Sequence, residues 1–278
     1  MLGKLMKHEF RATGRIMLPL LGAELLLSVL AGLSVRGLDR LENMGFLGVT
    51  YILTLSVFFL GLFALAVVAF VLMIQRFYRN LLRDEGYLAM TLPVSVDEQI
   101  WSKLLVSFVW FLAVGVLSVV TMLILLALGA RVNLLRDMFF DEQLREVIRE
   151  ITSHVGGGNI VLFALESVVL FFLGTCATCL RCYSALAIGH SAADHKMLLS
   201  FVTYFIIGMA LSLLQNAVTF GVLPHLDLDR LLMNIDTLEG GLLFAHGAMW
   251  VGAVLSLVYS AIFYFLTRWF LKNKLNLA

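Results

Sequence analysis

Charged side chains are scarce in this sequence. They make up 14% of its 278 residues, whereas hydrophobic residues make up 61%. An ordinary soluble domain carries roughly 25% charged residues, so this balance predicts a polytopic membrane protein. The few charges do not gather into one basic face, and we expect no nucleic-acid partner.

Catalytic and nucleotide-binding motifs are also lacking. The sequence contains no G-x-x-x-x-G-K-[ST], no H-E-x-x-H and no G-x-S-x-G. Without the first of these motifs the chain has no P-loop whose backbone N–H groups would hold nucleotide phosphates. We therefore expect that this chain is not an enzyme and that it binds no cofactor or metal of its own.

Cysteine is rare as well, and its three copies are Cys176, Cys179 and Cys182. None falls in a predicted outer loop, so no disulfide framework is expected. Their C-x-x-C-x-x-C spacing places them on a slowly drifting stripe along one helix, and this arrangement favours a role in helix packing. His190 and His195 lie nearby in the sequence. Acylation or thiol reactivity is an alternative, and so is a metal or iron–sulfur site, which would need a fourth ligand.

Six apolar runs reach the roughly 20 residues that a helix needs to cross a bilayer. They predict an all-α fold with six transmembrane helices, and an even number places both termini on one side. That side holds 13 of the 20 Lys and Arg residues, so we expect a cell-membrane protein with both termini in the cytoplasm. The predicted spans are Ile16 to Val35, Val49 to Ile74, Leu104 to Ala130, Ile160 to Leu180, Leu198 to Val222 and Ala248 to Trp269.

The first 15 residues have the periodicity of an amphipathic helix. Four cations fall on one narrow arc, and apolar side chains occupy the opposite side. Such a helix lies in a membrane surface; a solvated basic start that only fixes orientation is the alternative. Glu9 falls on the apolar side, where we expect it to meet a polar partner. The four cations are Lys4, Lys7, Arg11 and Arg15.

A polar island at 76–103 joins the second and third predicted spans on the cytoplasmic side. A plain connecting turn needs far fewer residues, so we expect the island to dock on something soluble. Ser95 and Glu98 form a capping-box pattern just before the next apolar run. Upstream, Gly86 and Pro93 interrupt helical structure. The sequence predicts a second span prolonged through Arg83, then a bend with a short amphipathic segment.

Two predicted outer loops, 131–159 and 224–241, carry apolar residues at near-helical spacing. Each predicts either a surface or lid helix or an interfacial helix that rests on lipid. The first loop ends in three successive glycines, 156–158, where we expect helical structure to break.

Glu24 and Glu166 are the carboxylates that lie deep inside apolar runs. An ionisable residue inside a membrane is costly unless it is paired or faces water, so each is a candidate for a translocation path. Glu166 lies at about the depth of Gln215 and Asn216, which allows a hydrogen bond among them. For both carboxylates the alternative is a protonated group that joins two helices by a hydrogen bond.

Two short stretches resemble the permease subunits of type-2 ABC exporters. One is KHEFRATGR at 7–15, which leads into Leu18-Pro19, and the other is DEGYL at 84–88, which leads into Leu92-Pro93. The six-span layout resembles that of the family from end to end. The chain departs from larger members of the family because it has no large extracellular domain.

The resemblance implies an elbow helix before the first span, and a coupling helix between the second and third spans that sits in a cleft of an ATPase. It also implies a dimer of permeases, identical or related, and separate soluble ATPase subunits that bind ATP and Mg. Pro93 and Ser95 would start the third span. The implied coupling residues are Arg83, Asp84, Glu85, Gly86, Tyr87 and Leu88.

Other classes of protein stay open. An ion-coupled secondary carrier would use Glu24 and Glu166 and would transport without an ATPase. A scaffold or sensor partner would use the island for docking alone, and an intramembrane enzyme would need a catalytic cluster that is not visible. For an exporter, apolar spans with few fixed cations favour a hydrophobic, drug-like or antimicrobial-peptide substrate, with sodium extrusion through Glu24 as the alternative.

Overall fold

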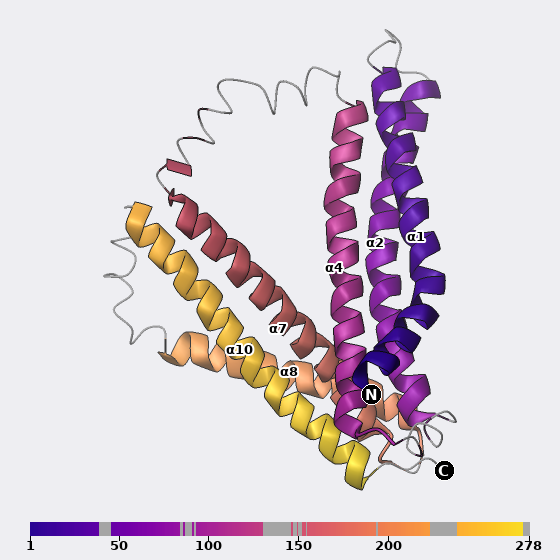
Figure 1. The fold of residues 1–278 in the computed structure, drawn as a ribbon, viewed down its shortest axis with the longest axis vertical. Helices are drawn as coiled ribbons and strands as arrows, with labels where there is room; N and C mark the ends of the chain where they lie inside the picture. Colours follow the sequence, from indigo (N-terminus) through magenta and orange to yellow (C-terminus); the bar gives the residue numbers. More distant parts are fainter. Residues whose placement is uncertain are drawn as a thin grey trace. The chain divides into compact units, whose positions relative to one another are not determined.

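The structure is a computed structural model that describes residues 1–38, 46–83, 86, 91, 93–129, 146, 149, 152–153, 155–192, 194–222 and 238–274. Within these residues the chain forms helices and no strands (Figure 1), which confirms the predicted all-α class. The long helices are α1 (Leu2–Leu38), α2 (Phe46–Leu82), α4 (Val96–Gly129), α7 (Gly157–Gly189), α8 (Lys196–Val222) and α10 (Leu238–Asn273).

Each of these helices contains a stretch that is long and apolar enough to cross a membrane. A hydrocarbon core of about 30 Å needs about 20 helical residues at about 1.5 Å per residue. The shortest of the six stretches, Lys196–Ala217, has 22 residues. The prediction of six helices that are long and apolar enough to cross a membrane is therefore confirmed for the described part of the chain.

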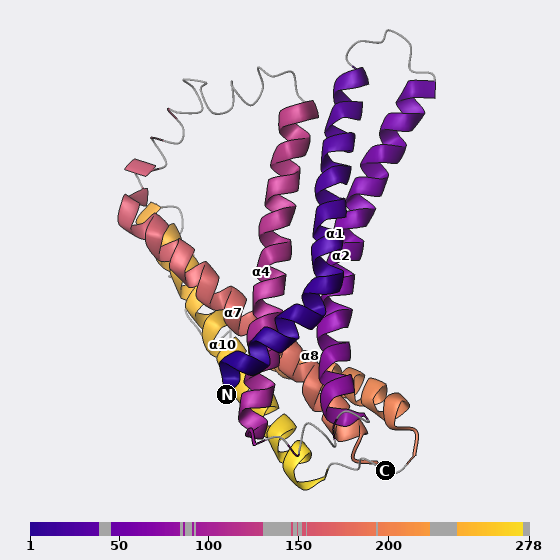
Figure 2. The same cartoon turned by 45° about the vertical axis from the view of Figure 1, so that its right-hand side comes forward.

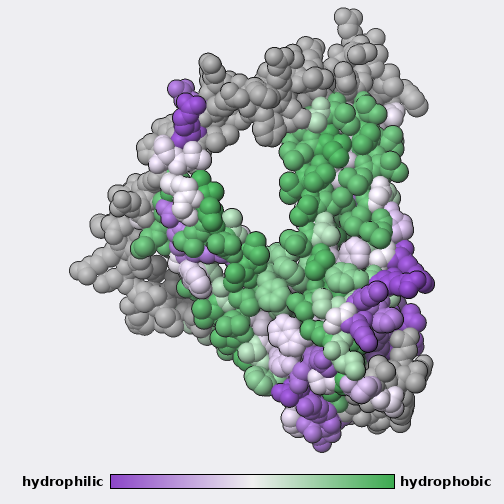
Figure 3. All heavy atoms as spheres, viewed as in Figure 1, coloured by the Kyte–Doolittle hydropathy of each residue, from purple (hydrophilic) through white to green (hydrophobic). Residues whose placement is uncertain are grey.

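The outward faces of the helices are largely apolar. Leu60, Phe63 and Leu213, for example, expose 65%, 68% and 65% of their surface. Figure 3 shows hydrophobic residues over most of the visible helix surface, and hydrophilic residues gathered toward helix ends. Water disfavours an apolar surface of this extent. Lipid accepts it, provided that backbone groups pair internally as they do in a helix, so the fold is that of a polytopic membrane protein.

The contacts divide the chain into two compact units. The α1 unit comprises residues 3–73 and 105–150, and the α7 unit comprises residues 1–2, 74–104 and 151–278. Two helices contribute to both units, because the last turns of α2 and the first turns of α4 belong to the α7 unit.

The core of the α1 unit is formed by α1, α2 and α4. Trp110 donates a hydrogen bond from its indole nitrogen to the hydroxyl oxygen of Thr13 at 2.8 Å, which gives the buried indole the partner it needs. The Thr13 hydroxyl in turn donates to the carbonyl oxygen of Glu9 at 2.8 Å. The apolar cluster around this pair consists of Met17, Leu65, Ala69, Met73, Val106 and Trp110.

Helix α1 is continuous from its second residue onward, so the predicted surface segment and the first span share one helix. Figure 2 shows that this helix bends along its length. Pro19 lies inside it. A proline has no N–H to donate to residue i−4, and its ring crowds that carbonyl group, which accounts for a bend.

In the α7 unit, α7 contacts both α8 and α10. Gly189 closes α7 and lies against Ser200 of α8, so closely that a Cβ atom would overlap the backbone of Ser200. On α10, a Cβ atom at Gly252 would come within 3.3 Å of the side chain of Leu170. Glycine at both places lets neighbouring helices approach closely.

The three glycines before α7 do not all interrupt the helix. Gly156 has a φ of 75°, which favours glycine, and precedes the helix as its N-cap residue. Its carbonyl oxygen accepts the N–H of Asn159 at 3.1 Å. Gly157 and Gly158 are already helical, so the predicted break in helical structure is confined to Gly156. The remainder of the 131–159 loop helix lies almost entirely outside the described residues.

The predicted capping box is confirmed at the start of α4. The backbone N–H of Glu98 donates to Ser95 Oγ at 3.1 Å, and the backbone N–H of Ser95 donates to a carboxylate oxygen of Glu98, also at 3.1 Å. Two N–H groups that the helix cannot pair internally are thereby satisfied. Helix α4 begins directly afterwards, at Val96.

Replacement of Ser95 by alanine removes one half of this box. We expect Ser95→Ala to lower the free energy of unfolding by about 1 kcal/mol, measured by SDS titration in mixed micelles. Ser118→Ala is the control, because the Ser118 hydroxyl bonds only a carbonyl of its own helix. Equal losses for the two variants would contradict a capping role.

Candidate functional site

The two helices that flank the polar island end close to their predicted positions. α2 ends at Leu82 and α4 begins at Val96. Of the implied coupling residues, Arg83 is exposed, with its guanidinium carbon 5.6 Å from the centre of the Tyr78 ring. Gly86 donates its backbone N–H to the carbonyl oxygen of Arg83 at 2.6 Å. Four others lie outside the described residues: Asp84, Glu85, Tyr87 and Leu88.

Aromatic contacts hold the end of α2 against α7. The rings of Phe77 and Tyr183 stack with centroids 3.9 Å apart and an angle of 6° between their planes, and both side chains are fully buried. One residue further on, Tyr78 meets the ring of His190 edge-on at 5.2 Å. Because aromatic pairs of this kind add stability beyond the area they bury, the last turns of α2 are fastened to the α7 unit.

His190 lies just beyond α7 and is buried, with 3% of its surface exposed. Its Nδ1 atom is 2.9 Å from the carbonyl oxygen of Leu186 and 3.4 Å from the hydroxyl oxygen of Ser200. Burial lowers the pKa of this imidazole because it disfavours the charged form. The Leu186 carbonyl opposes that shift, and the nearby charge of Lys196 adds to it.

The start of α4 is tied to α10 by polar contacts. Asp97 accepts a hydrogen bond from the hydroxyl group of Tyr264 at 2.5 Å and lies 3.0 Å from Nε of Arg268. The ring of Trp101 packs against that of Tyr264, with centroids 6.2 Å apart. The island is therefore fastened at both ends within the α7 unit. Sequence reasoning missed these contacts, because nothing local links Asp97 to residues more than 160 positions away.

The cations of the predicted elbow helix, Lys4, Lys7, Arg11 and Arg15, are all exposed. On the other side of α1, Met6 and Phe10 pack against the core cluster of the α1 unit, and Glu9 keeps only 7% of its surface exposed. The helix thus has one cationic face and one apolar face. That its cationic face lies on a membrane surface stays a prediction.

Glu24 is buried in the α1 unit. It exposes 3% of its surface, and its Oε1 atom has no hydrogen-bond partner among the described residues. Its other carboxylate oxygen lies against Gly61 of α2, where a Cβ atom would overlap it. The absence of a side chain at Gly61 thus provides the space that the Glu24 carboxyl group occupies.

Glu166 forms a pair that the sequence did not indicate. Its Oε2 atom lies 2.6 Å from Nδ1 of His246 on α10, and Phe163 stacks on the imidazole ring with centroids 3.9 Å apart. Glu166 forms no hydrogen bond with Gln215 or Asn216, both of which are exposed on α8. His246 was missed because the sixth span was predicted to start at Ala248, two residues after it.

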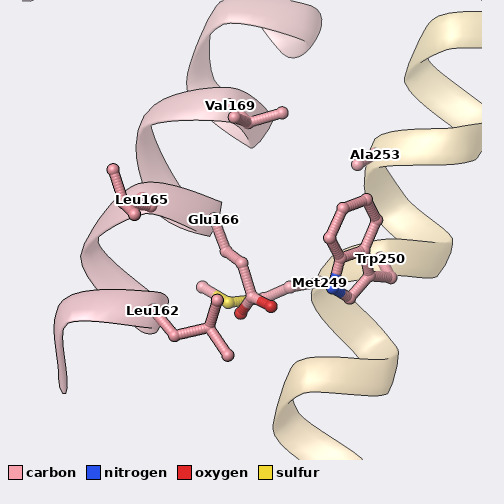
Figure 4. Close-up of a pocket in the computed structure, with 7 residues that line it drawn as sticks. All are labelled: Leu162, Leu165, Glu166, Val169, Met249, Trp250 and Ala253. Atoms are coloured by element: carbon pink, nitrogen blue, oxygen red, sulfur yellow. The ribbon is translucent and has the colours of Figure 1, made fainter. Parts of the chain in front are cut away.

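Two cavities border the predicted path residues. One, of about 390 Å³, lies among α7, α8 and α10 and includes Gln215, Arg181 and Tyr259. The other, of about 190 Å³, lies between α7 and α10, and Figure 4 shows the Glu166 side chain extending from α7 toward α10 there. Its remaining lining residues are apolar: Leu162, Leu165, Val169, Met249, Trp250 and Ala253.

Cys176, Cys179 and Cys182 are all buried as free thiols. Their exposed fractions are 4%, 2% and 5%, as packing residues would show. Across the part of the chain that the structure describes, no group of three or more His, Cys, Asp or Glu side chains is placed to hold a metal ion.

No protein-family model matches the chain, and neither a curated protein nor a solved structure is significantly similar to it.

Substitution at Gly61 tests the space around Glu24. We expect Gly61→Ala to lower the free energy of unfolding by about 1–3 kcal/mol through overpacking. Gly115→Ala is the matched control, since a Cβ atom there meets nothing within 4 Å. Combining Gly61→Ala with Glu24→Ala should recover much of the loss. Simple additivity of the two losses would show that the carboxyl group is not what fills this space.

The buried His190 imidazole predicts a dependence of stability on pH. Its pKa is lowered in the folded protein, so below about pH 6.5 the unfolded chain takes up a proton that the folded chain does not. Stability should be fully present above that pH and should fall as the pH drops toward the lowered pKa. Denaturation from pH 8 to pH 5 measures this, and His190→Gln should flatten the curve. An unchanged slope in that variant would assign the dependence to other groups.

Proposed function

We propose that the chain is the membrane-spanning subunit of an ATP-driven exporter of the type-2 ABC permease kind. The observation that carries the proposal is the way in which the polar island is fastened. Phe77 and Tyr78, near its start, hold the end of α2 on α7, and Asp97, toward its end, holds the start of α4 on α10. A segment that receives force from a soluble partner needs rigid attachment at both ends.

Helices α2 and α4 supply a mechanical route from the island. Each contributes residues to both compact units, and an α-helix transmits a displacement along its length as a near-rigid rod. A movement of the island would therefore tilt both helices. In the proposed cycle, closure of ATPase subunits around ATP and Mg moves the island, and the tilt alternates access between the two sides of the cell membrane.

The remaining parts of the proposal concern partners. The sequence has no P-loop, so ATP hydrolysis belongs to separate soluble ATPase subunits, and a second permease, identical or related, completes the complex. The exposed cations of α1 fit an elbow helix in the cytoplasmic membrane surface. The apolar helices favour a hydrophobic, drug-like or antimicrobial-peptide substrate.

An ion-coupled carrier is the second candidate, and a specific observation favours it. Glu24 and Glu166 are both more than nine-tenths buried, and each has one carboxylate oxygen without a hydrogen-bond partner among the described residues. Such groups are costly in a membrane unless they bind something. A carrier would use them to bind protons or sodium, and would work without an ATPase.

Co-purification in mild detergent separates the two candidates. We expect the tagged chain to retain a soluble ATPase, identified by mass, and we expect Asp84→Ala combined with Tyr87→Ala to lose that subunit or to uncouple its ATP hydrolysis from transport. The reason is that a charged and aromatic docking surface depends on a few central side chains.

Asp141→Ala combined with Arg145→Ala is the control, since these residues lie in the predicted outer loop. This variant should retain the ATPase in wild-type amount. A chain that purifies folded, without an ATPase, and that transports in response to an ion gradient would overturn the proposal in favour of the carrier.

A further inference from the structure

The cavity between α7 and α10 combines an apolar wall with one buried carboxylate. Glu166 exposes 7% of its surface and borders the cavity. His246 occupies its Oε2 atom, while Oε1 is buried and has no partner among the described residues. A buried polar atom without a partner costs free energy comparable to a lost hydrogen bond. The cavity therefore lacks one hydrogen-bond donor.

Neither helix supplies a cation that could serve as this donor. The first Lys or Arg of α7 is Arg181, which lies about 22 Å from Glu166 along the helix axis. On α10 the first is Arg268, which is about 33 Å from His246 along the axis. Within this pair of helices, the contact that the structure shows for the Glu166 carboxyl group is the one with the imidazole of His246.

The cavity wall favours an apolar body with a cationic end. Its volume of about 190 Å³ exceeds the roughly 150 Å³ of a protein cavity that holds benzene. Trp250 lines it beside Glu166 (Figure 4), and the face of an indole ring attracts cations. A carboxylate next to an aromatic ring in an apolar cleft suits a protonated amine that carries a hydrocarbon group.

The outer rim of the cavity faces away from the protein. Leu165 and Trp250 expose 60% and 58% of their surface, and both lie within the membrane-crossing stretches of α7 and α10. A ligand would thus enter from the lipid, where amphiphiles concentrate.

We propose that the α7–α10 cavity is a binding site for cationic amphiphiles, in which a protonated amine donates a hydrogen bond to Glu166 and its hydrocarbon part packs against Trp250 and Val169. His246 acts as a positioning residue, because its contact holds Oε2 and leaves Oε1 as the carboxylate oxygen without a partner among the described residues. The site does not depend on the proposed export function, since this chain alone forms it.

Direct binding to the full chain tests the proposal. The protein is placed in phosphatidylcholine nanodiscs at pH 7, and radiolabelled decylamine is titrated by scintillation proximity, with empty nanodiscs subtracted. We expect saturable binding that unlabelled decylamine displaces and that decanol, which has the same chain length without the charge, does not. Glu166→Gln should weaken binding at least about 10-fold, and Trp250→Leu should weaken it about 3-fold.

Two further variants complete the experiment. Ser118→Ala changes a hydroxyl group of α4 that bonds a carbonyl of its own helix, and it should leave binding unchanged. Val169→Trp fills the cavity, retains Glu166 and should abolish binding, so it answers the question even if Glu166→Gln does not fold. The proposal is overturned if the wild-type chain shows no saturable binding, if decanol competes as well as decylamine, or if Glu166→Gln or Val169→Trp binds like wild type.

Discussion

Hydrocarbon offers no hydrogen bonds, so a polar group on a membrane-crossing helix is costly unless it finds a partner within the protein. The long helices meet that demand for the backbone, and several buried hydroxyl groups meet it by donating to carbonyl groups of their own helix. Ser28 donates to Leu25 at 2.7 Å, and Thr267 donates to Phe263 at 2.7 Å. Both side chains are fully buried. These local solutions let apolar packing determine how the helices are arranged within each unit.

Two ionisable side chains are instead paired between one helix and another. Asp97 of α4 is held by Tyr264 and Arg268 of α10 near helix ends, where side chains can reach the polar boundary of a membrane. Glu166 and His246 form a similar pair farther from helix ends. The first pair fastens a helix. The second pair leaves one carboxylate oxygen without a partner in the described part of the chain. For that reason we interpret the first pair as structural and the second as part of a binding site.

The polar island and the α7–α10 cavity both belong to the α7 unit, yet they concern different events. Around the island, stacked and buried rings such as Phe77 and Tyr183 favour rigidity, which suits the transmission of a displacement. Around the cavity, Leu165 and Trp250 stay exposed, which suits access from lipid. In an exporter, the polar island would receive the displacement produced when the ATPase subunits close. The α7–α10 cavity would hold an amphiphile while the helices tilt.

Composition and periodicity determined the class, the six spans and the capping box at Ser95, because all of these depend on residues close together in the sequence. Tertiary structure decided which polar side chains meet. Asp97 with Arg268, Glu166 with His246 and Gly61 with Glu24 are each brought together by packing between helices. Sequence spacing gives the depth of a residue in a membrane but not the rotation of its helix or the identity of its neighbour, and that rotation decided the partner of Glu166.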